Sequence, residues 1–200
     1  MCTIYISHFE QTADRKYRTE HSAGLRLLSA ALDDCFGIYI PAENLPAAIR
    51  TGTYGKPELI SHPDIHFNIS HSEDIAACAL SRQEIGVDIE KIQPFRESVI
   101  RKVLTDGEKD FLNRMGTDTV SRQEWFFRFW TLKESRIKHS GMGLSMPLDS
   151  FSFQYDLNSS PCRISSTEHD LYFHQQMLHR EYILSVCTSV PNTEPVIIYV

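Results

Sequence analysis

Two pairs of short apolar stretches predict four β-strands, each pair joined by a turn. The first pair covers residues 75–80 and 85–90, and the second covers residues 182–188 and 196–200. Residues 81–84 and 190–193 provide the turns, and residues 1–7 alternate in the same way as a further strand. The repeated strand–turn–strand pattern indicates a chain built from two similar halves.

The longest helical pattern runs over residues 122–140, where aromatic and aliphatic residues recur at helical spacing. Such a stripe is typical of a helix that packs on a core. Gly141 and Gly143 follow it as stop signals. Further helices are predicted over residues 22–34, 96–101 and 106–115, a surface loop over 117–121, and a strand followed by a loop over 150–163.

These elements predict an α+β fold with two similar α/β halves in a pseudo-two-fold arrangement. Residues 1–100 would form the N-terminal half and residues 101–200 the C-terminal half, each with a small antiparallel sheet and a packed long helix. In the second copy, Ile198 and Val200 occupy the places of Asp88 and Glu90. We therefore expect a single active site, at the interface of the halves.

The strand at residues 85–90 carries two carboxylates on one face. Because side chains alternate along a strand, Asp88 and Glu90 point one way and the intervening apolar residues the other. With Glu134 as a third carboxylate, they would suit Mg²⁺, which prefers oxygen ligands. An ordinary amphipathic strand with a solvated acidic face is the alternative, and the pair alone does not exclude it.

Two charged residues of the long helix share one of its faces. Glu134 and Lys138 are four residues apart, so they could form a surface pair worth about 0.2–0.5 kcal/mol. A carboxylate close to lysines also suits a metal-bound phosphate ligand, because the lysines Lys133 and Lys138 could neutralise phosphate oxygens.

Four motifs, in order, resemble the larger, surfactin-synthetase-activating (Sfp-like) class of 4′-phosphopantetheinyl transferases. Each is weak alone, but the ordered set is specific and covers residues 54–144. The motifs are Gly-Lys-Pro at 55–57, Phe-Asn-Ile-Ser-His-Ser at 67–72, Gly-Val-Asp-Ile-Glu at 86–90, and Phe-Trp-Thr-Leu-Lys-Glu-Ser at 129–135 with Lys138 and Gly-Met-Gly-Leu at 141–144.

The resemblance implies a defined reaction. Members transfer the phosphopantetheine arm of coenzyme A to a serine hydroxyl of an acyl or peptidyl carrier protein and release adenosine 3′,5′-bisphosphate, with Mg²⁺ as cofactor. It also implies a tandem fold that acts as a monomer with one active site. Phosphoryl-type transfer needs mainly positioning and charge neutralisation, which agrees with the carboxylates and lysines.

The resemblance assigns roles to individual residues. Asp88, Glu90 and Glu134 match the metal ligands, and Glu108 falls where the family has a carboxylate proposed as general base. The catalytic group would be Glu108, Glu134 and Lys138. The residues expected to hold coenzyme A are Lys56, Ser70, His71, Lys133, Lys138 and Arg26.

Several of these residues have plainer interpretations. A lone histidine such as His71 is more often structural, and Lys56 could be a turn lysine between Gly55 and Pro57. Basic residues near the start would hold the 3′-phosphate, and four are candidates: Arg15, Lys16, Arg18 and Arg26. Such a run is also typical of a solvated face.

Composition limits the partners and the compartment. The formal net charge of −6 argues against nucleic acid as a partner. No apolar run approaches the roughly 20 residues of a membrane-spanning helix. Five scattered cysteines form no pairing pattern, so we expect a cytoplasmic protein.

Two other functions fit part of the pattern. One is a different Mg²⁺-dependent enzyme that processes phosphodiesters, although the acidic charge and the lack of a basic stripe count against it. The other is a non-catalytic module that binds coenzyme A or a carrier protein, although such a module would tend to lose the three carboxylates and Glu108.

Overall fold

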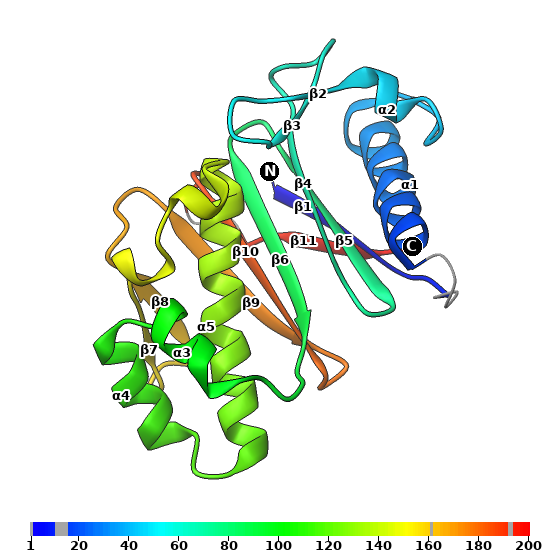
Figure 1. Ribbon diagram of the computed structural model, residues 1–200. Coiled ribbons are helices and arrows are strands. Elements are labelled where there is room, and N and C mark those ends of the chain that lie inside the picture. Colours follow the sequence, from blue (N-terminus) through cyan, green and yellow to red (C-terminus); the bar gives the residue numbers. More distant parts are fainter. Residues whose placement is uncertain (1, 11–15, 161, 192–193) are drawn as a thin grey trace.

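Four layers, in the order helix, sheet, sheet, helix, make up the protein (Figure 1). The computed structural model describes residues 2–10, 16–160, 162–191 and 194–200, without the side chains of residues 16–18 and 144. Apolar residues from the facing sides of the two sheets, such as Ile4, Ala77, Val87 and Leu184, form the central core. The α+β class is confirmed.

The first sheet has the strand order β11-β1-β5-β4. β1 pairs with β11 in parallel and with β5 antiparallel, and β5 pairs antiparallel with β4. Helix α1 (Lys16–Phe36) covers its outer face with residues such as Leu28 and Leu32. The strands are β1 (Cys2–His8), β4 (His66–Ser72), β5 (Ile75–Ser81) and β11 (Val196–Tyr199).

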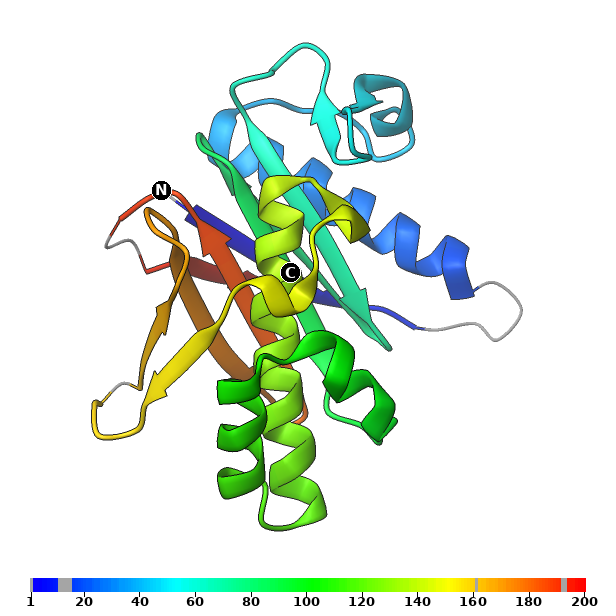
Figure 2. The ribbon, with the colours of Figure 1, turned by 60° about the vertical axis from the view of Figure 1, so that its left-hand side comes forward.

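The second sheet is antiparallel, with the order β6-β10-β9. Its outer face is covered by α5 (Thr119–Ser140), which Figure 2 shows running the length of the sheet. The strands are β6 (Ile85–Lys91), β9 (Tyr172–Leu178) and β10 (Tyr182–Thr188). The predicted helix at 122–140 is confirmed, but it begins at Thr119, because Asp118 caps it in a capping box with Ser121. The predicted loop at 117–121 is therefore wrong from Thr119 onward.

The predicted strands are present, but the two predicted hairpins are not. β5 and β6 belong to different sheets, and so do β10 and β11. The reason is that both edges of β5 are occupied, by β1 and β4, and both edges of β10 are occupied, by β6 and β9. Each second strand therefore crosses to the other sheet.

Smaller elements surround these layers. Helices α3 (Glu97–Val103) and α4 (Asp106–Met115) lie along α5, close to the predictions for 96–101 and 106–115. The strand predicted within residues 150–163 is confirmed as β7, but its antiparallel partner β8 was not predicted. The pair projects beside α5 in Figure 2. The remaining elements are α2 (Leu45–Ala48), β2 (Ile49–Thr51), β3 (Pro57–Leu59), β7 (Phe153–Asp156), β8 (Arg163–Ser166) and the 3₁₀ turns Gly143–Ser145 and Leu148–Ser150. In the described part of the chain, no helix is long and apolar enough to cross a membrane.

Candidate active site at the seam between the sheets

Helix α5 lies directly on strand β6 because residue 86 is a glycine. A Cβ atom at Gly86 would lie 2.0 Å from the carbonyl oxygen of Ser135 and 2.3 Å from the backbone nitrogen of His139. The helix backbone therefore touches the strand. This contact lets Glu134 and Lys138, one on each side of Ser135 in the chain, reach the carboxylates of β6.

Replacement of Gly86 by alanine tests this contact. Neither clashing atom is on a flexible side chain, so α5 must shift away from β6. We expect the free energy of unfolding to fall by about 1–3 kcal/mol in urea titrations. Gly107→Ala, which meets nothing within 4 Å, is the matched control. Equal stability of the Gly86 variant and the unaltered protein would contradict this account.

The three predicted metal ligands line one hollow of about 260 Å³. Asp88 and Glu90 enter it from β6, and Glu134 enters from α5 together with Lys138. Four further residues complete the lining: Ile69, Ser70, His71 and Trp130. The geometry therefore brings together residues from three of the four sequence motifs.

Asp88 is the most buried of the three carboxylates, with 3% of its surface exposed. Its Oδ1 accepts hydrogen bonds from Lys138 Nζ at 2.6 Å and from Ser70 Oγ at 3.0 Å. Its Oδ2 is buried and has no hydrogen-bond partner among the described residues. Burial raises the pKa of Asp88, although Lys138 opposes the shift. A solvated acidic face is therefore excluded for this residue.

The other two carboxylates share this unfavourable environment. Burial, and then the charge of Asp88, raises the pKa of Glu90 to about 7 and raises that of Glu134 as well. Glu90 accepts a hydrogen bond from Ser72 Oγ at 2.8 Å. Burial and mutual repulsion make the charged forms of these three carboxylates unfavourable, and a bound hard cation would relieve both effects.

Two observations bear in opposite directions on whether the three carboxylates can hold a divalent cation. Among the described residues, no three His, Cys, Asp or Glu side chains stand as a ready-made metal cluster. The ammonium group of Lys138 instead lies against Asp88 Oδ1. The unpartnered Oδ2 atom and the mutual repulsion of the carboxylates nevertheless fit a divalent ion.

A second hollow, of about 300 Å³, adjoins the first through Glu134 and Lys138. Its walls include Tyr54, Lys56 and Ile137. Lys56 Nζ donates to the carbonyl oxygens of Ile85 at 3.0 Å and His139 at 2.8 Å, and it also contacts Glu84. Lys56 therefore lies beside the site and also ties its loop to β6 and α5.

Ser70 and His71 lie within strand β4, where their side chains alternate. Ser70 points toward β6 and Asp88, whereas Nδ1 of His71 lies 3.7 Å from Glu20 Oε2 of α1. Both line the carboxylate hollow. Arg26 is exposed on α1 and is not among the residues that line either hollow. Of the other three candidates for the 3′-phosphate, Arg15 and the side chains of Lys16 and Arg18 lie outside the described residues.

Glu108 and Lys133 are not brought to this group. They pair with each other at 2.8 Å in the interior, where their side chains are 1% and 0% exposed. Glu108 also accepts hydrogen bonds from the backbone nitrogens of Thr105 and Phe153, and Lys133 donates to the carbonyl oxygens of Leu148 and Phe151. All of these contacts are internal, so the geometry does not support Glu108 as a base or Lys133 as a phosphate contact.

Three residues at or beside the site, Trp130, Asn68 and Ser72, were not among the predicted site residues. Trp130, assigned to the core stripe, lines the hollow and lowers the pKa of Glu90 against the larger effect of burial. Asn68 and Ser72 lie on β4 in alternation with Ser70 and face β6. The polar-apolar alternation of residues 67–72 was the signal that could have identified them.

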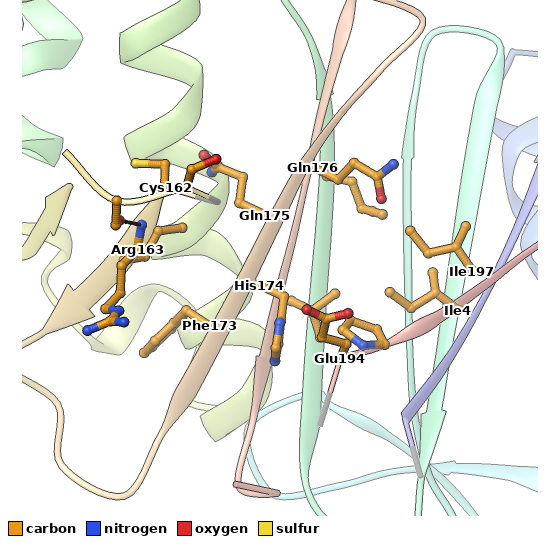
Figure 3. A pocket seen from close by; sticks show the side chains of 15 residues that line it. Ile4, Cys162, Arg163, Phe173, His174, Gln175, Gln176, Glu194 and Ile197 are labelled. Carbon is orange, nitrogen blue, oxygen red and sulfur yellow. Dashed lines mark hydrogen bonds between the residues drawn. The ribbon is translucent and has the colours of Figure 1, made fainter. Parts of the chain in front are cut away.

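A separate cavity of about 500 Å³ lies around β9, at the open edge of the second sheet (Figure 3). His174, Gln176 and Ile197 line it, and none of the predicted site residues does. Burial lowers the pKa of His174, and Glu194 partly offsets the shift. This cavity is distinct from the two hollows at α5.

The sequence of this chain is similar to those of known 4′-phosphopantetheinyl transferases. A sequence model described as the 4′-phosphopantetheinyl transferase superfamily matches residues 84–187. A 4′-phosphopantetheinyl transferase of Bacillus subtilis is 35% identical over 150 residues, which cover 74% of this chain and 66% of that protein. The 4′-phosphopantetheinyl transferase Sfp of Bacillus subtilis strain 168 is 35% identical over 71% of this chain and 63% of its own length. The matched region thus spans just under two thirds of both relatives.

A more distant relative matches over more of its length. The 4′-phosphopantetheinyl transferase AcpT of Escherichia coli O157:H7 is 30% identical over 92% of this chain and 82% of its own. A crystal structure of a Bacillus anthracis holo-(acyl-carrier-protein) synthase with CoA covers 52% of this chain and 93% of its own, at 18% identity and a TM-score of 0.43, too weak a likeness to bear on the site. From the model match over residues 84–187 and these relatives, we conclude that the chain belongs to the 4′-phosphopantetheinyl transferase superfamily.

Proposed function

We propose that this protein transfers the 4′-phosphopantetheine group of coenzyme A to a serine hydroxyl of an apo acyl or peptidyl carrier protein. The observation that carries the proposal is the cluster of Asp88, Glu90 and Glu134 with Lys138 in one hollow. The relatives are named for the same transfer. The serine oxygen would bond to the phosphorus that carries pantetheine, the bond from that phosphorus to adenosine 3′,5′-bisphosphate would break, and the serine proton would be released.

The three carboxylates would hold Mg²⁺ in this reaction. When bound, Mg²⁺ supplies positive charge that neutralises the diphosphate as its bond breaks. Lys138 contributes a second positive charge in the same hollow, and it can turn from Asp88 Oδ1 to a phosphate oxygen. Lys56, in the adjoining hollow, is the next cation available to the coenzyme. Ser70 and His71 line the hollow and would contact the diphosphate.

The chain would act as a monomer, because a single chain supplies every residue of the site. We also propose that the two halves, residues 1–100 and 101–200, are repeats in pseudo-two-fold arrangement with the site at their interface. The support is topological: α1 covers the strand order β1-β5-β4, and α5 covers the matching order β6-β10-β9. Because β6 (Ile85–Lys91) belongs to the second of these units, the second repeat would begin near residue 85 rather than at residue 101.

Mass spectrometry of an intact apo carrier protein tests the transfer and its metal together. After incubation with this protein, coenzyme A and Mg²⁺, we expect a mass gain equal to one phosphopantetheine. EDTA should abolish the gain, because the carboxylates alone repel the diphosphate, and excess Mg²⁺ should restore it. A mass gain that persists in EDTA would exclude the metal, and no gain on several unrelated carriers would favour a binding module.

A further inference from the structure

The two sheets meet at β4 and β6 without backbone pairing. Each of three β4 side chains accepts a hydrogen bond from the backbone N–H of a β6 residue. The pairs are Asn68 Oδ1 with Val87 at 2.8 Å, Ser70 Oγ with Ile89 at 3.3 Å, and Ser72 Oγ with Lys91 at 3.1 Å. A buried N–H without a partner is costly, so these three polar side chains take the role of a missing neighbour strand.

We call these three side-chain-to-backbone hydrogen bonds between β4 and β6 the ladder. Its two hydroxyls also donate hydrogen bonds to the carboxylates. Ser70 Oγ donates to Asp88 Oδ1 at 3.0 Å, and Ser72 Oγ donates to Glu90 Oε2 at 2.8 Å. A hydroxyl that accepts a backbone N–H keeps one proton to donate. Each serine thereby ties a carboxylate to the backbone of the next residue of β6, and the ladder sets the direction in which each carboxylate points.

Ser72 differs from Ser70 in one respect. Ser70 lines the carboxylate hollow, whereas Ser72 is 8% exposed and is not among the residues that line it. Ser72 is thus connected to the hollow through Glu90, which accepts its hydrogen bond and lines the hollow. Trp130 of α5 also lines the hollow and lies beside Glu90.

We infer that Ser72 is a positioning residue, which orients the Glu90 carboxylate toward a divalent cation in the hollow. The inference rests on the proposed function, because that function is what identifies the ligand of the hollow as a divalent cation. Groups that hydrogen-bond to metal ligands typically change metal affinity by about 10–100-fold when they are removed. Because Ser72 is the hydrogen-bond donor from β4 to Glu90, an effect at the lower end of that range is expected.

The test measures Mn²⁺ binding, since Mn²⁺ also prefers oxygen ligands. Free Mn²⁺ is titrated by electron paramagnetic resonance, with and without coenzyme A, in the unaltered protein and in variants. Ser72→Ala should raise the dissociation constant about tenfold. Ser72→Thr, which keeps the hydroxyl, should stay within about threefold. Ser81→Ala is the matched control, because Ser81 is a buried strand serine that accepts from Gln83 N away from the carboxylates.

Thermal unfolding separates positioning from stability. Ser72→Ala loses the hydrogen bond from the Lys91 backbone nitrogen and should therefore be less stable than the unaltered protein. If that variant does not fold, Ser72→Cys, which keeps a weak hydrogen-bond donor of similar size, is used for the same titration. The inference is overturned if Ser72→Ala binds Mn²⁺ as tightly as the unaltered protein, or if Ser81→Ala weakens binding as much as Ser72→Ala does. It is also overturned if the unaltered protein binds no Mn²⁺. Mn²⁺ binding that weakens as expected, in a protein that modifies no carrier, refutes the proposed function but supports the role of Ser72.

Discussion

Asp88→Asn is expected to lower the rate of the proposed phosphopantetheine transfer at least about a thousandfold. The substitution keeps the shape of the side chain and removes its charge. A metal ion contributes several kcal/mol of charge stabilisation in such a transfer, and about 4 kcal/mol corresponds to a thousandfold in rate. The measurement is the initial rate of carrier modification at saturating coenzyme A and Mg²⁺.

The same variant should remain folded. Burial raises the pKa of Asp88, which means that the charged form is held against an unfavourable environment. We therefore expect the thermal midpoint of Asp88→Asn to equal or exceed that of the unaltered protein. Asp106→Asn, at a side chain that is 98% exposed, is the control for both measurements. A folded Asp88→Asn protein with the unaltered rate would remove this carboxylate from the reaction.

Lys133→Met is expected to lower the free energy of unfolding by about 3–5 kcal/mol, because it leaves the Glu108 carboxylate buried without its cation. Glu108→Gln should also destabilise, since it leaves the Lys133 ammonium buried instead. The double variant should recover a large part of the loss. Urea unfolding measures all three, with Lys109→Met on the surface of α4 as the control.

These variants also decide between two roles for Glu108. A general base would give a Glu108→Gln protein with unaltered stability and a low rate of transfer. A buried structural pair gives an unstable protein, and the transfer rate per folded molecule changes little. The second outcome is expected, because the oxygens of Glu108 meet Lys133 and two backbone N–H groups inside the protein.

The strands and the helix around the site could be predicted from local patterns, whereas the strands with which each strand pairs could not. The alternation in residues 85–90 predicted which way Asp88 and Glu90 point, and the four-residue spacing placed Glu134 and Lys138 together on one face. The predicted hairpins failed because the free edge of a strand depends on distant neighbours: β1 and β4 occupy both edges of β5.

Long-range contacts also explain why some residues lie where the sequence does not predict. The motif put Lys133 next to Glu134 in sequence, but adjacent helix positions face different directions, so only Glu134 reaches the hollow. The pairing of Lys133 with Glu108 joins α5 to α4, across residues that no local pattern relates. The contacts of Ser72 with Glu90 and Lys91 depend on β6 lying against β4, which no local pattern predicts.

The crossing of β6 and β11 between the sheets has a consequence for how the protein is made. β6 has no strand to pair with until residues 182–188 exist, and β1 lacks its second neighbour until residues 196–199 exist. Pairings between segments so far apart in the chain form slowly. On the ribosome, two strand edges therefore stay open until these later segments have been made, and the nascent chain needs protection from aggregation over that interval.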